Sequence, residues 1–354
     1  MEDKENQMKF GLFYFANDSM EDSGEGRYKM LLDGARFADR NGFSAVWTPE
    51  RHFHSFGGLY PNPAVTGAAL ATATERISIR AGSVVAPLHS PLRIAEEWSV
   101  VDNLSGGRVE VSFASGWHPT DFCLGQGPYV DRKQIMLETI EQVQTLWRGN
   151  AIEVTDGAGN PTSVRAFPPP VQKALPVWVT SAGEAETFRL AGARKSHLLT
   201  HLLHQDVDEL AEKIAEYRAA ARQEHGDWQG RVAVMLHTFL GQDTEYVREV
   251  VREPMCDYLK GSFHLIARSI ADVGPDFDVE SLHEDDIDFL VERSFETYFA
   301  ERGLFGTVDD AARMVERLRG IGVDEIACLI DFGVDGKVAL DGLQTLNELR
   351  LRCQ

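Results

Sequence analysis

Short apolar runs alternate with amphipathic stretches along most of this chain of 354 residues. Residues 9–15 form the first apolar run, and a polar loop containing glycine follows it. Residues 28–40 then carry apolar side chains at helical spacing, and Asn41-Gly42 ends the segment. Because the same order recurs downstream, we predict a strand followed by a helix as the repeating unit of the fold.

Three further units of this kind precede residue 149. We predict strands from residue 43 to Glu50, over 77–86 and over 109–117, and helices over 63–74, 92–104 and 131–147. Pro87 and Pro91 end the third strand. Ser105-Gly106-Gly107-Arg108 resembles a phosphate loop, but it follows a helix and precedes a strand, so its glycines predict a helix C-cap and a turn.

Two segments interrupt the alternation. Residues 149–175 are rich in turn residues and contain three consecutive prolines, so we predict an insertion there, with a small hairpin. Residues 254–303 predict a helical insertion rich in acidic residues. The repeating units otherwise continue. We predict strands over 176–181, 197–203, 232–241 and 325–333. We predict helices over 183–194, 207–225, 307–322 and 340–351, and a further helix near 245–251.

Eight strands alternating with helices over ~250 core residues predict a (β/α)8 barrel, an α/β fold, as a single domain over residues 1–354. The insertions then follow the fourth strand and precede the eighth. A doubly wound open sheet is the alternative fold. It is disfavoured because no predicted strand is followed by a GxGxxG motif and no half-chain repeat is evident.

The charge and cysteine content exclude several classes of function. With 35 basic and 55 acidic residues, the formal net charge of -20 opposes binding to nucleic acid or to an anionic membrane surface. The four cysteines are far apart and form no CxxC, so we expect reduced thiols rather than disulfides or a zinc ribbon. The N-terminus lacks the positive charge of a signal peptide, and no apolar segment approaches the ~20 residues that span a bilayer. We therefore expect a cytoplasmic protein.

In a barrel, the polar residues that follow the strands gather at one end. The second strand ends in Glu50, Arg51, His52 and His54; the alternative is that Glu50 and Arg51 form a surface ion pair and the histidines cap a loop. Candidates from the other strands are Ser83, Val84, Ser115, Gly116, Trp117, His118, Asp121, Thr180, Ser181, Gly183, Glu184, Thr187, His201, His237 and Asp331.

The turn after the fifth strand is a candidate anion site. Ser181 and Gly183 lead directly into a helix, so hydroxyl and N–H groups can converge at its positive end. The alternative is an N-cap by Ser181, with Glu184 completing a capping box. The third strand, with its small residues and prolines, can lie against a flat ligand, but the pattern alone favours core packing with a turn.

Two other chemistries were weighed. The residues His52, His54, His201, His237 and Asp331 could ligate a metal in a hydrolase barrel, but barrel hydrolases of that type carry their His-x-His pair on the first strand. Cys123 could be a nucleophile, but no base can be assigned to it, and a small buried hydrophobic residue is the simpler reading.

Several motifs resemble the luciferase-like, flavin-dependent monooxygenases. They are GFSAVWTPERHFHSFGG at the second strand, RISIRAGSVVAPLHSPLRIAEEWSVVDNLSGGRVEVSFASGW through the third and fourth, the HPTDF that follows, and PVWVTSAGEAETF at the fifth. The resemblance covers roughly residues 9–225 in matching order, but no motif covers 254–303. More narrowly, the chain resembles the subgroup associated with polyketide and nonribosomal peptide biosynthesis.

The resemblance implies a dimeric barrel that binds reduced FMN at the carboxyl ends of its strands. A separate NAD(P)H:flavin reductase would supply the reduced flavin, and dioxygen would form a C4a-hydroperoxide on it. Ser83 and Val84 would belong to a bulge against the isoalloxazine ring, where family members often have a non-proline cis peptide. By the same resemblance, Ser115, Gly116 and Asp121 would line the flavin, and Ser181, Gly183, Glu184 and Thr187 would surround its phosphate.

The resemblance also assigns the chemistry. His52 matches one histidine of a pair in the luciferase pattern, whereas the neighbouring position is Arg51, which excludes a histidine base there and makes light emission less expected. We predict His52 as acid/base, Arg51 as a stabiliser of an anionic group, and Glu50 and His54 as supports. Substrates would be small molecules or carrier-protein-tethered intermediates, which the acidic insertion could contact. Alternatives are a deazaflavin (F420)-dependent oxidoreductase and a silent flavin-binding protein.

Overall fold

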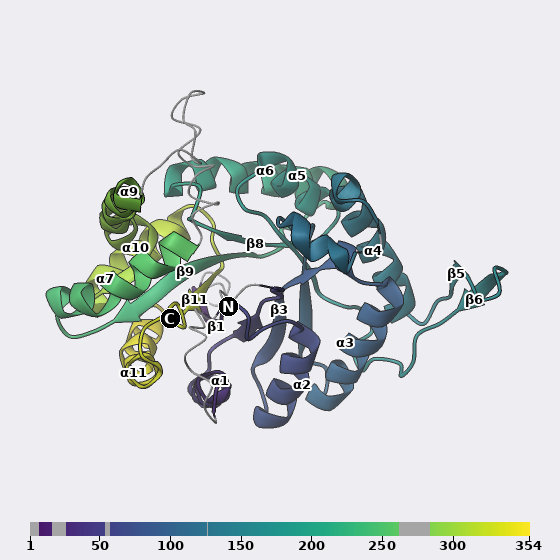
Figure 1. Cartoon of the computed structure of the whole chain (residues 1–354), viewed down its shortest axis with the longest axis horizontal. Helices are drawn as coiled ribbons and strands as arrows, with labels where there is room; N and C mark the ends of the chain where they lie inside the picture. The colour runs from purple at the N-terminus through teal and green to yellow at the C-terminus, as the bar shows by residue number, and fades with distance from the viewer. Residues whose placement is uncertain (1–6, 16–25, 54–56, 126, 262–283) are drawn as a thin grey trace.

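A closed parallel barrel forms the centre of the computed structural model, which describes residues 7–15, 26–53, 57–125, 127–261 and 284–354 (Figure 1). Its strands are β1 (Lys9–Phe13), β2 (Ala45–Thr48), β3 (Ser78–Val85), β4 (Val109–Ala114), β7 (Val177–Thr180), β8 (His197–His201), β9 (Val232–Leu240) and β11 (Glu325–Leu329). Each pairs with the next, and β11 pairs with β1. The predicted (β/α)8 barrel is confirmed, and the doubly wound alternative is wrong.

Helices surround the barrel, as Figure 1 shows. They are α1 (Lys29–Asn41), α2 (Pro63–Ala73), α3 (Pro91–Ser105), α4 (Arg132–Trp147), α5 (Ala185–Ala193), α6 (Val207–His225), α7 (Thr244–Gly261), α10 (Val308–Gly320) and α11 (Gly336–Arg352). Gly42 and Gly106 end α1 and α3 in the left-handed conformation, as their sequence context predicts. No helix in the described part of the chain is long and apolar enough to cross a membrane.

The two predicted insertions contain regular structure. In the first, β5 (Ile152–Thr155) and β6 (Pro161–Val164) form an antiparallel hairpin that projects away from the barrel (Figure 1). Between β9 and β11, the chain forms α7, α9 (Glu284–Thr297), a π-helix (Tyr298–Arg302) and the short strand β10 (Leu304–Gly306), which extends the sheet at β9. Residues 262–283, which form the middle part of the 254–303 insertion predicted to contact substrate, lie outside the described residues.

The helix predicted near residues 245–251 is longer than the sequence pattern indicated. It continues as α7 to Gly261 with Pro254 inside it. Met255, Tyr258 and Leu259, beyond the proline, are all buried. Burying these side chains outweighs the backbone hydrogen bond that the proline removes, so the tertiary structure overrides the local signal.

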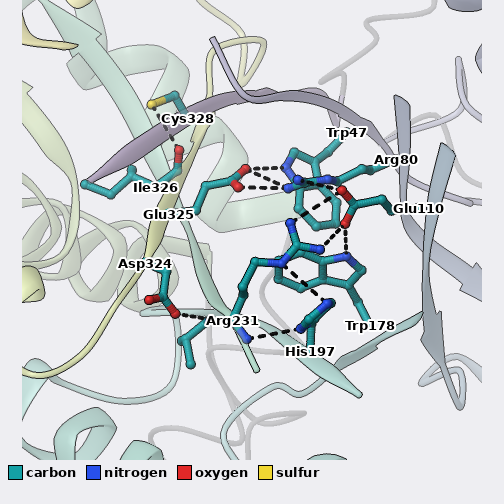
Figure 2. A network of polar contacts seen from close by, with 11 residues as sticks. Trp47, Arg80, Glu110, Trp178, His197, Arg231, Asp324, Glu325, Ile326 and Cys328 are labelled. Atoms are coloured by element: carbon teal, nitrogen blue, oxygen red, sulfur yellow. Dashed lines mark hydrogen bonds and ion pairs between the residues drawn. The ribbon is translucent and has the colours of Figure 1, made fainter. Parts of the chain in front are cut away.

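A network of buried charges occupies the barrel at the amino-terminal ends of its strands (Figure 2). Arg80 Nη1 donates to both carboxylate oxygens of Glu325 at 2.9 and 2.8 Å, and its Nη2 donates to Glu110 at 3.0 Å. The guanidinium lies over the rings of Trp47 and Trp178, at 4.7 and 4.9 Å from their centroids. Burial would raise the pKa of Glu110, but Arg80 and Arg231 lower it to about 2.

Candidate functional site

A buried carboxylate organises the residues that follow β2. Glu50 Oε1 accepts hydrogen bonds from His52 Nε2 at 2.8 Å and from His89 Nε2 at 2.5 Å. Its Oε2 accepts the N–H of Val85, the last residue of β3, at 2.7 Å. The side chain of Glu50 is 0% exposed, so the surface ion pair with Arg51 that we considered as an alternative is wrong.

These contacts determine the charge of the carboxylate. Burial alone would raise the pKa of Glu50, but hydrogen bonds from His52, His89 and the Val85 N–H hold it below its usual value. Burial would lower the pKa of His89, and its bond to Glu50 raises it above the usual value instead. The carboxylate is therefore ionised at neutral pH and orients both imidazole rings.

Arg51 lies beside this cluster, packed between aromatic rings. Its guanidinium carbon is 5.0 Å from the ring centroid of Phe15 and 4.8 Å from that of Trp117. Burial lowers the pKa of Arg51, although a guanidinium stays protonated at any physiological pH. The arrangement holds a positive charge in a fixed position at the carboxyl ends of β1, β2 and β4.

Asp331, which follows β11, joins the same region. Its Oδ1 accepts the N–H of Phe15 at 2.6 Å, and its Oδ2 accepts the hydroxyl of Tyr60 at 3.3 Å. The carbonyl of Tyr60 in turn accepts the N–H of Arg51 at 2.9 Å. Asp331 therefore acts here as a structural link between β1 and the segment that carries Arg51.

The bulge predicted in the third strand is present. The register of β3 against β4 shifts between Ala81 and Val84, and the peptide bond between Gly82 and Ser83 is cis. Ser83 Oγ lies 2.5 Å from Thr180 Oγ1, which is 2.7 Å from Ser112 Oγ. A chain of three hydroxyls thus connects the bulge to the end of β7, and Val84 beside it is buried.

The segment after β4 carries the next group of predicted residues. Ser115 and Gly116 are partly buried, and Gly116 has a φ of +81°. A Cβ on Gly116 would lie 3.0 Å from both Phe122 and Val85, so this position favours glycine for its backbone and for its space. Asp121, in a short 3-10 helix (Pro119–Cys123), has its Oδ1 3.8 Å from His118 Nδ1.

The turn between β7 and α5 differs from the predicted capping box. The helix begins at Ala185, and its N-cap is Glu184, whose side chain makes no capping hydrogen bond. Glu184 instead accepts from Lys133 Nζ at 2.5 Å and from Thr187 Oγ1 at 3.4 Å. The N-cap alternative for Ser181 is therefore wrong, because Ser181 Oγ accepts only the Gly183 N–H, at 3.3 Å, before the helix starts.

This turn retains the features of an anion site. Among the described residues, no side chain caps the first-turn N–H groups of α5, which lie at the positive end of its dipole. Gly183 has a φ of +122°, and a Cβ there would lie 3.5 Å from Gln205 Oε1 and 3.7 Å from Lys213 Nζ. Lys213 thus places a positive charge beside the turn, whereas the charge of Lys133 is paired with Glu184.

His237 in β9 is buried, His201 at the end of β8 is partly buried, and both are neutral. Burial lowers the pKa of His201 and of His237 to about 3. His201 Nδ1 accepts the N–H of Leu203 at 3.2 Å. The ring of His237 packs at right angles to Tyr258, 4.3 Å between centroids, and its Nε2 has no hydrogen-bond partner among the described residues.

The metal-ligand set considered from the sequence is not assembled in the described part of the chain. His52 bonds Glu50, His201 bonds Leu203, and Asp331 bonds Phe15 and Tyr60. His54 lies outside the described residues. Within them, only Glu50, His52 and His89 converge as metal-type ligands, and their N···O separations of 2.8 and 2.5 Å are hydrogen bonds, shorter than the ~3 Å between two ligands of one zinc ion.

Sequence reasoning missed four side chains that contact the predicted residues: His89, Lys133, Ser112 and Tyr60. His89 lies in the turn after β3, where a histidine between two prolines was the available signal. Lys133 gave no signal, because it contacts Glu184 from a helix 51 positions earlier. Cys123 is exposed, so the prediction that it is a small buried residue is wrong.

Acid is expected to destabilise the protein through its buried histidines. His237 has a pKa of about 3 in the folded chain and ~6.5 when unfolded, so between these values the unfolded state binds more protons. Stability is therefore lost as pH falls below ~6.5, by about 1.4 kcal/mol per histidine between pH 7.5 and 5.5.

Urea unfolding of the wild type and His237→Met at these two pH values tests this. Between pH 7.5 and 5.5, the free energy of unfolding of the variant is expected to fall by about 1.4 kcal/mol less than that of the wild type. His225→Gln, on the outer helix α6, is the control and should keep the wild-type pH dependence. An equal loss in His237→Met and the wild type would contradict the assignment.

Comparison with known proteins gives a consistent result. The family model described as luciferase-like monooxygenase matches residues 8–325. The oxygenase component of the flavin-dependent trigonelline monooxygenase of Acinetobacter baylyi is 25% identical over 250 residues, 70% of this chain and 69% of the relative. The alkanal monooxygenase alpha chain of Photorhabdus luminescens is 34% identical over 115 residues, which cover 32% of each chain.

Solved structures share the fold. Monooxygenase RslO1 from Streptomyces bottropensis superposes with a TM-score of 0.79 at 20% identity, over 98% of this chain and 99% of that chain. The oxygenating constituent of 3,6-diketocamphane monooxygenase of Pseudomonas putida, in complex with FMN, gives 0.75 at 17% identity over 98% of both chains. An F420-dependent secondary alcohol dehydrogenase superposes with a TM-score of 0.73 at 18% identity, over 98% of this chain and 99% of that chain.

Proposed function

The chain belongs to the luciferase-like monooxygenases, a family of flavin-dependent oxidoreductases, and from this premise we propose that it uses reduced FMN and dioxygen to oxygenate a natural-product intermediate. The substrate is a small molecule, free or tethered to a carrier protein. The observation that carries the proposal is the hydroxyl chain from Ser83 to Thr180, because it joins the bulge of β3 to the turn before α5.

The donor groups of the described residues support the proposal that FMN binds here. The first turn of α5, with Ser181, Gly183 and Lys213 beside it, offers N–H groups and positive charge to a phosphate. We propose that the flat ring packs against the bulge at Ser83 and Val84, both of which are buried. We propose that Ser115, Gly116 and Asp121 line the flavin beside this bulge; Gly116 packs so closely against Val85 and Phe122 that a Cβ there would lie 3.0 Å from both.

The protein's own groups then hold charges and protons. Reduced FMN, when bound, supplies the electrons with which one atom of dioxygen enters the substrate and the other leaves as water. His52 donates its Nε2–H to Glu50, so its Nδ1 is the atom that takes or gives a proton. Arg51, fixed between Phe15 and Trp117, stabilises negative charge that develops beside it.

Isotope-labelled dioxygen tests the proposal. The purified protein is supplied with reduced FMN or with reduced deazaflavin and then exposed to ¹⁸O₂ and candidate substrates. One ¹⁸O atom in the product, with FMN only, is the expected result. Turnover with deazaflavin alone and no label in the product would instead support the second candidate, a deazaflavin-dependent oxidoreductase. The F420-dependent alcohol dehydrogenase is an enzyme of that kind with the same fold.

A separate reductase is part of the proposal. The relative from Acinetobacter baylyi is named as an oxygenase component. We propose by analogy that an NAD(P)H:flavin reductase supplies this chain with reduced FMN, in the cytoplasm, where the free thiols of the described cysteines stay reduced. Activity in the absence of both an added reductase and chemically reduced flavin would contradict this arrangement.

The outer face of α2 and α3 supports a homodimer. The helix α2 contains no charged residue, and its Val65 is 67% exposed. Val100 and Leu104 of the adjacent α3 are also exposed. An uncharged helix with an exposed apolar side normally has a partner. Sedimentation should show a dimer for the wild type and a monomer for Val65→Glu/Leu104→Glu; a monomeric wild type would rule out this interface.

Gly183→Ala is expected to weaken FMN binding about tenfold. A side chain at φ +122° costs about 1–2 kcal/mol, which the turn can relieve only by moving its N–H groups. Titration calorimetry with FMN measures the change. Gly159→Ala is the matched control, because Gly159 also has a positive φ but lies in the projecting hairpin with no atom within 4 Å of its Cβ position. Equal affinities for the two variants would contradict a phosphate site at Gly183.

A further inference from the structure

We propose that His89 is a positioning residue of this site. His89 shares the carboxylate of Glu50 with His52, and it exchanges the proton of the two histidines with solvent. The inference rests on the proposed function in one respect, that His52 is the acid/base group. Nothing in the luciferase-like sequence motifs singled out this residue, and the geometry of the folded chain alone points to it.

The arrangement is a carboxylate between two imidazoles. Both Nε2 atoms lie within hydrogen-bond distance of the same oxygen, Glu50 Oε1, at 2.8 Å for His52 and 2.5 Å for His89. The other carboxylate oxygen is held by the Val85 N–H. Because Glu50 cannot turn without losing these bonds, it fixes the Nε2–H form of both rings and leaves each Nδ1 for proton exchange.

The two histidines differ in access to solvent. The side chains are 0% exposed for Glu50, 11% for His52 and 26% for His89. His52 extends from the segment after β2, whereas His89 follows the 3-10 helix (Ala86–Leu88) at the end of β3. His89 is therefore the member of the pair through which protons from water enter and leave.

The surrounding charges favour one proton on the pair. Besides Glu50, the charged group that acts on His89 is Glu97 of α3, and Glu97 is itself bonded to Arg93 at 2.7 Å. Asp121 lies on the 3-10 helix that packs against the one before His89, and His118 is the residue that precedes that helix. One buried carboxylate stabilises one imidazolium, while two adjacent imidazoliums repel each other.

Because Glu50 stabilises only one imidazolium, the two histidines share a single proton in excess of their neutral forms. When His52 Nδ1 takes a proton from a reacting group, His89 Nδ1 releases one to water, and both Nε2–H bonds to Glu50 remain. When His52 gives its proton back, His89 takes one from water. The net charge of the three groups stays constant in both directions, so the buried carboxylate never faces two cations or none.

Imidazole NMR of the flavin-free protein tests the coupling without any turnover. In His89→Gln, the amide can still donate to Glu50 but cannot titrate. The titration midpoint of the His52 ring should then rise by about 1 pH unit, because His52 no longer competes with a second cation for the carboxylate. The control, His225→Gln on α6, removes a histidine bonded to the Ala193 carbonyl and should leave the His52 midpoint unchanged.

The outcomes separate this inference from the proposed function. A His52 midpoint that moves by less than about 0.2 units in His89→Gln overturns the coupling, whatever the protein oxidises. One zinc or iron ion per chain after purification also overturns it, because the three groups would then be ligands. A raised midpoint supports it even if no ¹⁸O enters a product. In active protein, the acidic limb of the kcat/KM pH profile should shift upward by the same amount.

Discussion

Arg80→Met is expected to lower the free energy of unfolding by about 3–5 kcal/mol. Arg80 is 2% exposed and is bonded to Glu325 and Glu110, which are also buried. Removing the cation leaves two carboxylates inside the barrel with much of their charge uncompensated. The apolar replacement keeps the contacts with Trp47 and Trp178, so lost packing contributes little to the expected effect.

Chemical denaturation at pH 7 measures this loss. Arg231→Met is the matched control: Arg231 also bonds Glu110, at 2.6 Å, but its side chain is 28% exposed and Arg80 remains in place, so we expect a smaller effect. Adding Glu110→Gln and Glu325→Gln to Arg80→Met should recover part of the loss, because the buried charges are then gone. A loss below about 1 kcal/mol in Arg80→Met would show that water reaches the network.

His52→Gln is expected to lower kcat/KM about 10²–10⁴-fold under the proposed function, which is the usual contribution of a positioned acid/base group. The amide can keep a hydrogen bond to Glu50, so Glu50 should stay in place through His89 and the Val85 N–H. FMN affinity should therefore change by less than about threefold. The two effects together separate proton transfer from cofactor binding.

Steady-state kinetics with reduced FMN, and calorimetry with oxidised FMN, measure the two quantities. Thr187→Ala is a useful comparison, because Thr187 lies at the first turn of α5 and contacts Glu184. It is expected to act mainly on FMN affinity. A His52→Gln enzyme with near wild-type kcat/KM would assign the acid/base role to another group.

The sequence by itself predicted most of the fold. Apolar runs alternate with helical stretches along the barrel, and residues such as Gly42 and Gly106 mark helix ends through local contacts. These signals are short-range, so they can be read without knowing the fold. The eight-fold alternation then allows few topologies, and the order of the strands places Glu50, Arg51 and His52 at the end of the barrel where sites form.

The tertiary structure alone decided which of these side chains meet. Glu50 and His89 are 39 positions apart, Glu184 and Lys133 are 51 apart, and Arg80 and Glu325 are 245 apart. Such pairs depend on barrel closure and strand register, which no local pattern encodes. The same applies to α7, where burial carries the helix past Pro254. The sequence thus determined the elements and the end of the barrel that carries the site, whereas long-range packing determined the partners of each charge.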